Sequence, residues 1–171
     1  PPTSSITRRR SARRRWSGYA ISSVDASPIF YEVFGPAPSA DEGAPLPVVL
    51  CDGIGCDGFI WKYLTPLLAQ ERTVVHWHYR GHGRSPKPTS PERVSLEDLA
   101  DDLDSVLDDA GIEQAVLIGH SMGVQVALEF HRRHRYRNSG LVLVCGSPAE
   151  PLKTFKGSDI MEVVLPAVRT R

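Results

Sequence analysis

Short apolar segments alternate along this chain with longer segments whose apolar residues recur at helical spacing. Six segments rich in apolar and β-branched residues are predicted as strands: 19–24, 29–34, 48–51, 72–79, 115–119 and 141–145. Several of them are apolar throughout, which is typical of strands that are covered on both faces. Because helical segments lie between them, the pattern predicts an α/β fold with a doubly wound, mostly parallel sheet.

Three longer segments, 59–70, 95–110 and 121–134, carry the helical spacing. The second opens on a capping box, with Asp98 in place of the usual Glu or Gln, and stops at Gly111. Its apolar residues form one stripe: Leu96, Leu99, Leu103, Val106, Leu107 and Ala110. Its aspartates tend toward the other faces, where we predict a solvated acidic surface rather than a paired-carboxylate site: Asp101, Asp102, Asp104, Asp108 and Asp109.

The sequence Gly119-His120-Ser121-Met122-Gly123 joins a predicted buried strand to a predicted helix. A lone G-x-S-x-G is a weak signal, but at such a junction it is typical of a strained turn that exposes a serine hydroxyl above the sheet. The helix N-terminus then favours developing negative charge. We predict that Ser121 is a nucleophile and that His120 and Met122 shape the turn and the pocket wall.

A second glycine-rich turn, Asp52-Gly53-Ile54-Gly55, follows the apolar strand 48–51. Acyl transfer needs two N–H donors for the oxyanion, one from the residue after the nucleophile and one from an earlier loop. The candidates for this oxyanion hole are the backbone N–H groups of Met122 and Ile54.

These motifs together resemble the α/β-hydrolase family, in its branch of esterases, lipases and haloperoxidase-like enzymes. Segment 50–55 is similar to the oxyanion loop after the third strand, and 79–85 to the loop after the fourth. Segment 119–123 looks like the nucleophile elbow. The resemblance runs from about residue 19 to 148 and implies a serine hydrolase that acts on carboxylic esters or similar acyl substrates through an acyl-enzyme.

Two residues depart from the family's pattern. Asp52 stands where the family usually has a histidine, and His78 stands where it usually has an aspartate. Both belong to loop-supporting positions, so the departures bear on substrate preference more than on fold.

The general base and the acid of a triad have no good candidate in this chain. In this fold they follow the serine, and His131 and His134 both fall near the far end of the helix that Ser121 opens. A rise of about 1.5 Å per residue puts His131 roughly 15 Å from Ser121. Glu150 is a weak candidate for the acid. We therefore expect a hydrolase truncated after Arg171, with 148–171 as the start of its cap.

Charge divides the chain into two unlike parts, although Lys+Arg and Asp+Glu are 20 each. Six arginines lie within residues 8–15, and the rest of the chain has 14 basic and 20 acidic residues. We predict a disordered tail over 1–17 and a partial hydrolase domain from residue 18. The tail lacks interleaved aromatic residues, so nucleic acid is not an expected partner, and it lacks the apolar stretch of a secretory signal.

The other residue types exclude further classes of protein. No apolar run approaches a membrane span of roughly 18–20 residues. The three cysteines have no CxxC spacing and are predicted as buried thiols, which suits a reducing, cytoplasmic compartment. No phosphate loop, dinucleotide motif or metal cluster is present, so no cofactor and no metal are expected, and the expected partner is a small-molecule substrate. Two alternatives stay open: a catalytically inactive binding module with this fold, and a perhydrolase that uses the same serine.

Overall fold

The computed structural model describes residues 14–39, 41, 43–88, 90 and 92–148. Within this part, six strands form one sheet in the order β1-β2-β4-β3-β5-β6. The strands are β1 (Arg14–Ile21), β2 (Pro28–Phe34), β3 (Val48–Cys51), β4 (Val74–Trp77), β5 (Ala115–His120) and β6 (Asn138–Val144). β1, β2 and β4 pair antiparallel, and the other three pairings are parallel. The predicted mostly parallel sheet is confirmed.

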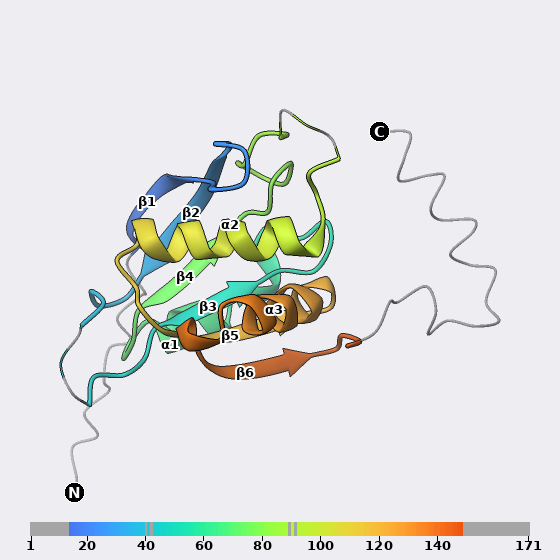
Figure 1. The fold of residues 1–171 in the computed structure, drawn as a ribbon. Helices are drawn as coiled ribbons and strands as arrows, with labels where there is room; N and C mark the ends of the chain where they lie inside the picture. The colour runs from blue at the N-terminus through green and yellow to red at the C-terminus, as the bar shows by residue number, and fades with distance from the viewer. Residues whose placement is uncertain (1–13, 40, 42, 89, 91, 149–171) are drawn as a thin grey trace, which may run out of the picture.

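Helices cover both faces of the sheet, as the doubly wound prediction requires. Figure 1 shows α2 (Leu96–Asp109) and α3 (Met122–Arg133) side by side on one face, with α1 (Leu64–Leu68) on the other. Alternate residues of β3 divide between the two faces. Val49 and Cys51 join the larger core with α2 and α3, whereas Val48 and Leu50 pack near α1.

Several predicted boundaries shift in the structure. β1 begins at Arg14, so residues 14–17 belong to a strand and not to the disordered tail predicted for them. The reason is pairing: residues 16–21 run antiparallel to β2, which places Trp16 edge-on against Tyr31. The helix predicted over 59–70 divides into a 3-10 turn, η1 (Phe59–Trp61), and the short α1.

The predicted capping box and apolar stripe of α2 are both confirmed. The Ser95 hydroxyl accepts from the Asp98 N–H, and the Asp98 carboxylate accepts from the Ser95 N–H. The acidic face, however, is not simply solvated. Asp101 accepts hydrogen bonds from Arg133 and His134, which lower its pKa although burial opposes this.

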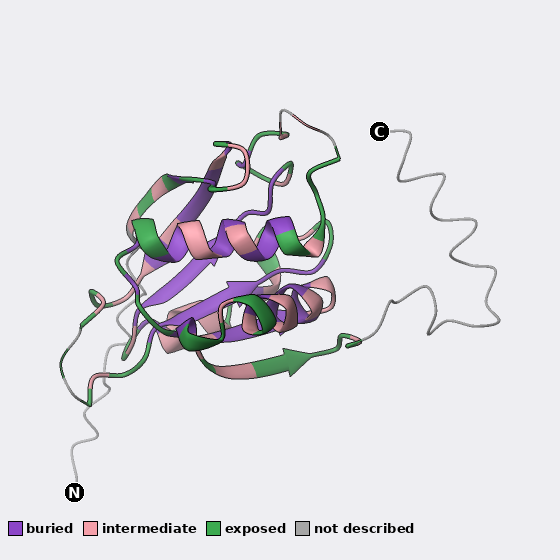
Figure 2. Cartoon of the chain, in the orientation of Figure 1, coloured by how far each residue is buried: buried purple, intermediate pink, exposed green. Residues whose placement is uncertain are grey.

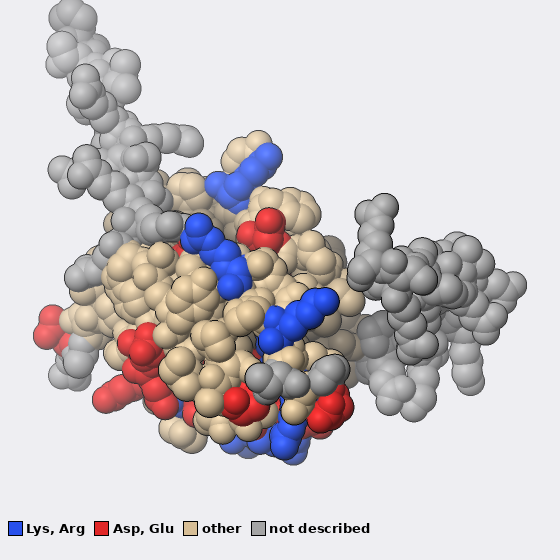
Figure 3. Space-filling view, turned by 90° about the horizontal axis from the view of Figure 1, so that it is seen from above, with Lys and Arg blue, Asp and Glu red and all other residues tan. Residues whose placement is uncertain are grey.

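The remaining aspartates of α2 also have partners. Arg137 contacts Asp104 and Asp108, and the Tyr31 hydroxyl donates to Asp109. Figure 3 shows acidic and basic side chains on one face of the molecule, some of them side by side at its lower edge. The acidic helix is therefore held to its neighbours by arginines from distant segments.

Asp102 is the clearest correction, because it is 0% exposed. The Arg80 guanidinium donates to both of its carboxylate oxygens, from Nε at 2.7 Å and from a terminal nitrogen at 2.6 Å. Arg80 also donates to the carbonyl of Arg93 and to the hydroxyl of Ser22. This ion pair joins the loop after β4 to the middle of α2.

The sheet ends at β6 within the described residues. Val142, Leu143 and Val144 are exposed, and Figure 2 shows how this strand differs from the buried centre of the sheet. The predicted start of a cap, 148–171, lies outside the described residues except for its first position. No helix in the described ranges is long and apolar enough to cross a membrane.

The Arg80–Asp102 pair leads to a prediction about stability. Asp102→Ala removes both short carboxylate contacts of a buried guanidinium and, of its carboxylate contacts, leaves only the one with Asp25 at 3.3 Å, so the free energy of unfolding is expected to fall by about 3 kcal/mol. Urea denaturation monitored by tryptophan fluorescence measures the change. Glu113→Ala, at an exposed position in the loop after the same helix, serves as the control and is expected to change stability by no more than about 0.5 kcal/mol. Equal losses in the two variants would contradict the prediction.

Candidate active site

Ser121 lies at the junction of β5 and α3 in a strained conformation. Its backbone has φ 54° and ψ −115°, a region that residues with a Cβ rarely adopt, and it is the N-cap of α3. The strain is held by hydrogen bonds on both sides: the Ser121 N–H donates to the Val144 carbonyl at 3.0 Å, and the Val124 N–H donates to the Ser121 carbonyl at 3.1 Å. The turn therefore has the geometry that the G-x-S-x-G motif predicts.

Both motif glycines are sterically required. A Cβ at Gly119 would lie 2.6 Å from the carbonyl carbon of Gly123, and a Cβ at Gly123 would lie 2.6 Å from the carbonyl carbon of Cys51. Gly146, in the segment after β6, meets the same region, since a Cβ there would lie 2.6 Å from the Ser121 carbonyl oxygen. The turn is thus enclosed by backbone from β3 and from the segment after β6.

The second glycine-rich turn lies directly beside Ser121. A Cβ at Gly53 would lie 3.2 Å from both the Ser121 Cβ and the His120 Nδ1. The Cys56 N–H donates to the Gly53 carbonyl, so Ile54 stands at the corner of a tight turn with its side chain 67% exposed. Met122 is the first residue of α3, where N–H groups have no partner within the helix. The fold therefore brings together the segments that carry Ser121, Ile54 and Met122.

No histidine after Ser121 reaches the turn. His131 contacts the Asn138 side chain and His134 contacts Asp101, both at the C-terminal end of α3. His82 lies against the carbonyl of Arg80. Glu150, the weak candidate for an acid, lies outside the described residues.

His78 supports the loop that follows β4. Its Nδ1 accepts a hydrogen bond from the Arg84 N–H at 2.8 Å, and its carbonyl accepts from the Ser85 hydroxyl. Accepting at Nδ1 requires a neutral ring, and burial, followed by the electrostatic effect of the neighbouring His76, lowers the pKa of His78 to about 4. A histidine can therefore serve as the hydrogen-bond acceptor at this loop-supporting position.

Asp52 has partners that the sequence did not reveal. The Trp61 indole N–H donates to its Oδ1 at 2.5 Å, and His76 Nε2 lies 2.9 Å from its Oδ2. Trp61 falls in a segment predicted only as a helix, and His76 falls in a segment predicted only as a strand. The sequence signal for these partners is the position of Asp52, an acidic residue directly after an apolar strand and at the start of the predicted oxyanion loop.

The cysteines differ from one another. Cys51 is buried, and burial raises the pKa of its thiol to about 12. Cys56 is partly buried and also has a raised pKa, caused first by burial and then by the charge of Asp52. Cys145 is exposed, so the prediction of a buried thiol is wrong there: it follows β6 at the edge of the sheet.

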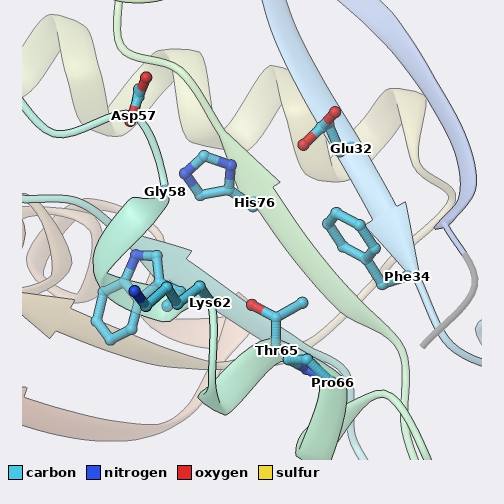
Figure 4. A pocket seen from close by; sticks show the side chains of 9 residues that line it. Glu32, Phe34, Asp57, Gly58, Lys62, Thr65, Pro66 and His76 are labelled. Carbon is cyan, nitrogen blue, oxygen red and sulfur yellow. The ribbon is translucent and has the colours of Figure 1, made fainter. Parts of the chain in front are cut away.

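A pocket of about 250 Å³ opens on the α1 face, and Ser121 is not among the residues that line it. Figure 4 shows the His76 ring at its centre, between the carboxylates of Asp57 and Glu32. Trp61 and Lys62 line it from the η1 side. Within the described ranges no group of three or more metal-ligating side chains converges, in this pocket or elsewhere.

Comparisons with known proteins agree with this geometry. The profile of a family described as the alpha/beta hydrolase fold matches residues 47–168. A protein named as a carbamate hydrolase, RutD, from Caulobacter vibrioides is 35% identical over 99 residues, 58% of this chain and 36% of that protein. Epoxide hydrolase B from Mycobacterium tuberculosis is 34% identical over 129 residues, 70% of this chain and 36% of its own length.

Solved structures show the same likeness. A carboxylesterase structure from Nitrososphaera gargenis superposes with a TM-score of 0.69 at 27% identity, covering 86% of this chain and 53% of the other. The esterase RhEst1 from Rhodococcus superposes with a TM-score of 0.64 at 29% identity, covering 80% and 46%. The matched part of this chain thus spans about a third of the length of the two curated relatives, 36% in each case. It spans about half of the length of the two esterase structures.

Gly123→Ala is expected to destabilise the fold. Alanine usually stabilises a helix relative to glycine, but here its Cβ meets the backbone of Cys51, so we expect a loss of about 3 kcal/mol or more in the free energy of unfolding. Chemical denaturation measures it. Gly140→Ala is the matched control, since its nearest contact would be an ordinary 3.6 Å to Val116. A Gly123→Ala protein as stable as Gly140→Ala would show that the close approach is wrong.

The lowered pKa of His78 predicts a pH dependence. Between pH about 6.5 and pH about 4, His78 binds a proton in the unfolded chain but not in the folded protein. The free energy of unfolding is therefore expected to decrease by about 3 kcal/mol as the pH is lowered across this window. Urea titrations at several pH values measure it, with His131→Gln as control. In the His78→Gln variant, the loss of unfolding free energy over the same pH range is expected to be smaller by about 3 kcal/mol. An unchanged slope in His78→Gln would contradict the assignment.

Proposed function

Because the chain belongs to the alpha/beta hydrolase fold family, we propose that it carries the nucleophile and the oxyanion hole of a serine hydrolase. The proposed substrates are carboxylic esters or similar acyl compounds. The observation that carries this proposal is Ser121, held at φ 54° at the N-terminus of α3 with Gly53 against its Cβ.

The proposed reaction proceeds through an acyl-enzyme. The Ser121 oxygen attacks the acyl carbon of the substrate, and the hydroxyl proton passes to a base. The electron pair of the C=O bond moves onto the carbonyl oxygen, and the N–H groups of Met122 and Ile54 stabilise the resulting oxyanion. When this pair returns, the bond to the leaving alcohol breaks and the alcohol takes the proton. Water then repeats the sequence on the acyl-serine and releases the acid.

A serine at this position favours acyl substrates over epoxides, although an epoxide hydrolase is among the relatives. Attack of a serine oxygen on an epoxide would produce an ether, which has no carbonyl for water to attack. Attack on an ester or a carbamate produces an acyl-serine that water can hydrolyse. The esterases and the carbamate hydrolase among the similar proteins fit this chemistry.

We infer that His131, His134 and His78 do not act as the general base for Ser121. His131 and His134 are engaged at the far end of α3, and His78 is fixed in a loop with its Nδ1 occupied. The alternative is a hydrolase fold that binds ligands without catalysis, in which Ser121 would have no reactivity.

A fluorophosphonate probe with added imidazole distinguishes these two functions. Imidazole supplies the base in solution, so we expect it to accelerate formation of an adduct on Ser121, identified by mass spectrometry of the peptide. Without imidazole, the adduct is expected to form slowly, because the serine and its base act as a unit. Ser121→Ala should abolish the adduct, whereas Ser139→Ala, at an exposed position in β6, should not affect it. Absence of any Ser121 adduct in imidazole would favour the binding module.

A further inference from the structure

Asp52 is a buried carboxylate that the proposed reaction does not use. It is 2% exposed and receives hydrogen bonds at three places. Trp61 Nε1 donates to Oδ1 at 2.5 Å, His76 Nε2 lies 2.9 Å from Oδ2, and the Tyr79 hydroxyl donates to the backbone carbonyl at 2.7 Å. A carboxylate taken out of water must be compensated in this way, and here the compensation also fixes the residue in place.

The fixed residue begins the oxyanion loop. Gly53 follows Asp52 and lies against Ser121, and the turn from Gly53 to Cys56 places Ile54 at its corner. The peptide plane that carries the Ile54 N–H therefore starts one residue after a position held from three directions. Small rotations at Asp52 would change the direction of that N–H.

The same contacts connect the loop to the nucleophile elbow. Trp61, which donates to Asp52, also meets the His120 ring edge-on, with 6.3 Å between ring centroids. His120 directly precedes Ser121, and its Nδ1 lies 3.2 Å from where a Cβ of Gly53 would be. The Trp61 indole thus contacts both of the turns that would supply the N–H donors of the proposed oxyanion hole.

We propose that Asp52 is the positioning residue of the oxyanion loop, held by Trp61 and His76, and that it sets the Ile54 N–H relative to Ser121. This inference rests on the proposed function, because it assigns Ile54 as an oxyanion donor. Asp52 acts through the backbone and touches no reacting atom.

A purely structural role for Asp52 would predict a different pattern. If the Asp52–His76 pair only stabilised the fold, its loss would lower stability without a selective effect on the loop that precedes Ser121. Asp57 provides a matched control, because it lies in the same loop, carries the same charge and is exposed. Comparing the two variants separates the loss of a charge from the loss of these contacts.

The experiment combines two measurements on the 171-residue chain. Backbone order parameters from 15N relaxation at Gly53, Ile54 and Gly55 report on the loop itself. The rate of fluorophosphonate labelling of Ser121 in imidazole reports on the oxyanion hole. For Asp52→Ala we expect lower order parameters in the loop and labelling that is slower by roughly 10- to 100-fold. We expect Asp52→Asn to retain most of both, because its amide still offers an oxygen to Trp61.

Trp61→Phe keeps the ring packing and removes only the N–H donor, so it tests the idea if Asp52→Ala does not fold. It is expected to loosen the loop and slow labelling, whereas Asp57→Ala changes neither. A loosened loop with unchanged labelling, or slower labelling with an unchanged loop, would overturn the inference. If the unmodified chain forms no adduct at all, the proposed function fails, and with it the assignment to Ile54. The order parameters would then still show whether Asp52 holds the loop.

Discussion

The close approach of α3 to β3 at Gly123 is the contact on which the candidate site depends. A Cβ at this position would lie 2.6 Å from the Cys51 carbonyl carbon and 2.8 Å from the Asp52 carbonyl oxygen. Because the two backbones meet without an intervening side chain, the first turn of α3 lies beside the loop that follows β3. The N-terminus of a helix and a glycine-rich turn thus face the same small volume, which is where a developing negative charge is best stabilised.

Buried polar pairs, rather than apolar packing alone, hold the loops around this volume. β4 and the residues directly after it supply such groups to both faces of the sheet. His76 meets Asp52 on the α1 side, while Arg80, just after the strand, meets Asp102 of α2 on the other side. A loop has little apolar surface of its own to bury, so directional contacts of this kind can fix its conformation where hydrophobic contacts cannot. The segment from His76 to Arg80 thereby anchors both the loop after β3 and the helix α2.

Local patterns predicted the parts of the fold that local physics determines. β3 was predicted with its observed bounds, Ser95 with its cap, and Ser121 with its strained turn, because each depends on residues within a few positions of one another. The failures involve distant partners. Asp102 was expected in solvent, but it meets Arg80, which is 22 residues earlier in the chain. β1 was expected to begin later, because nothing within 14–17 reveals its pairing with β2.

The same division explains why one half of the candidate site could be anticipated. The proposed nucleophile and the two proposed N–H donors belong to turns at the carboxyl ends of β3 and β5, which pair directly and in parallel. Parallel pairing brings those turns to one edge of the sheet, so two glycine motifs that follow predicted strands are sufficient to place them together. A general base has no such local signature, because a histidine can be brought to a serine from any distance along the chain. The histidines after Ser121 follow it within one helix, and a straight helix leads away from the turn at which it begins.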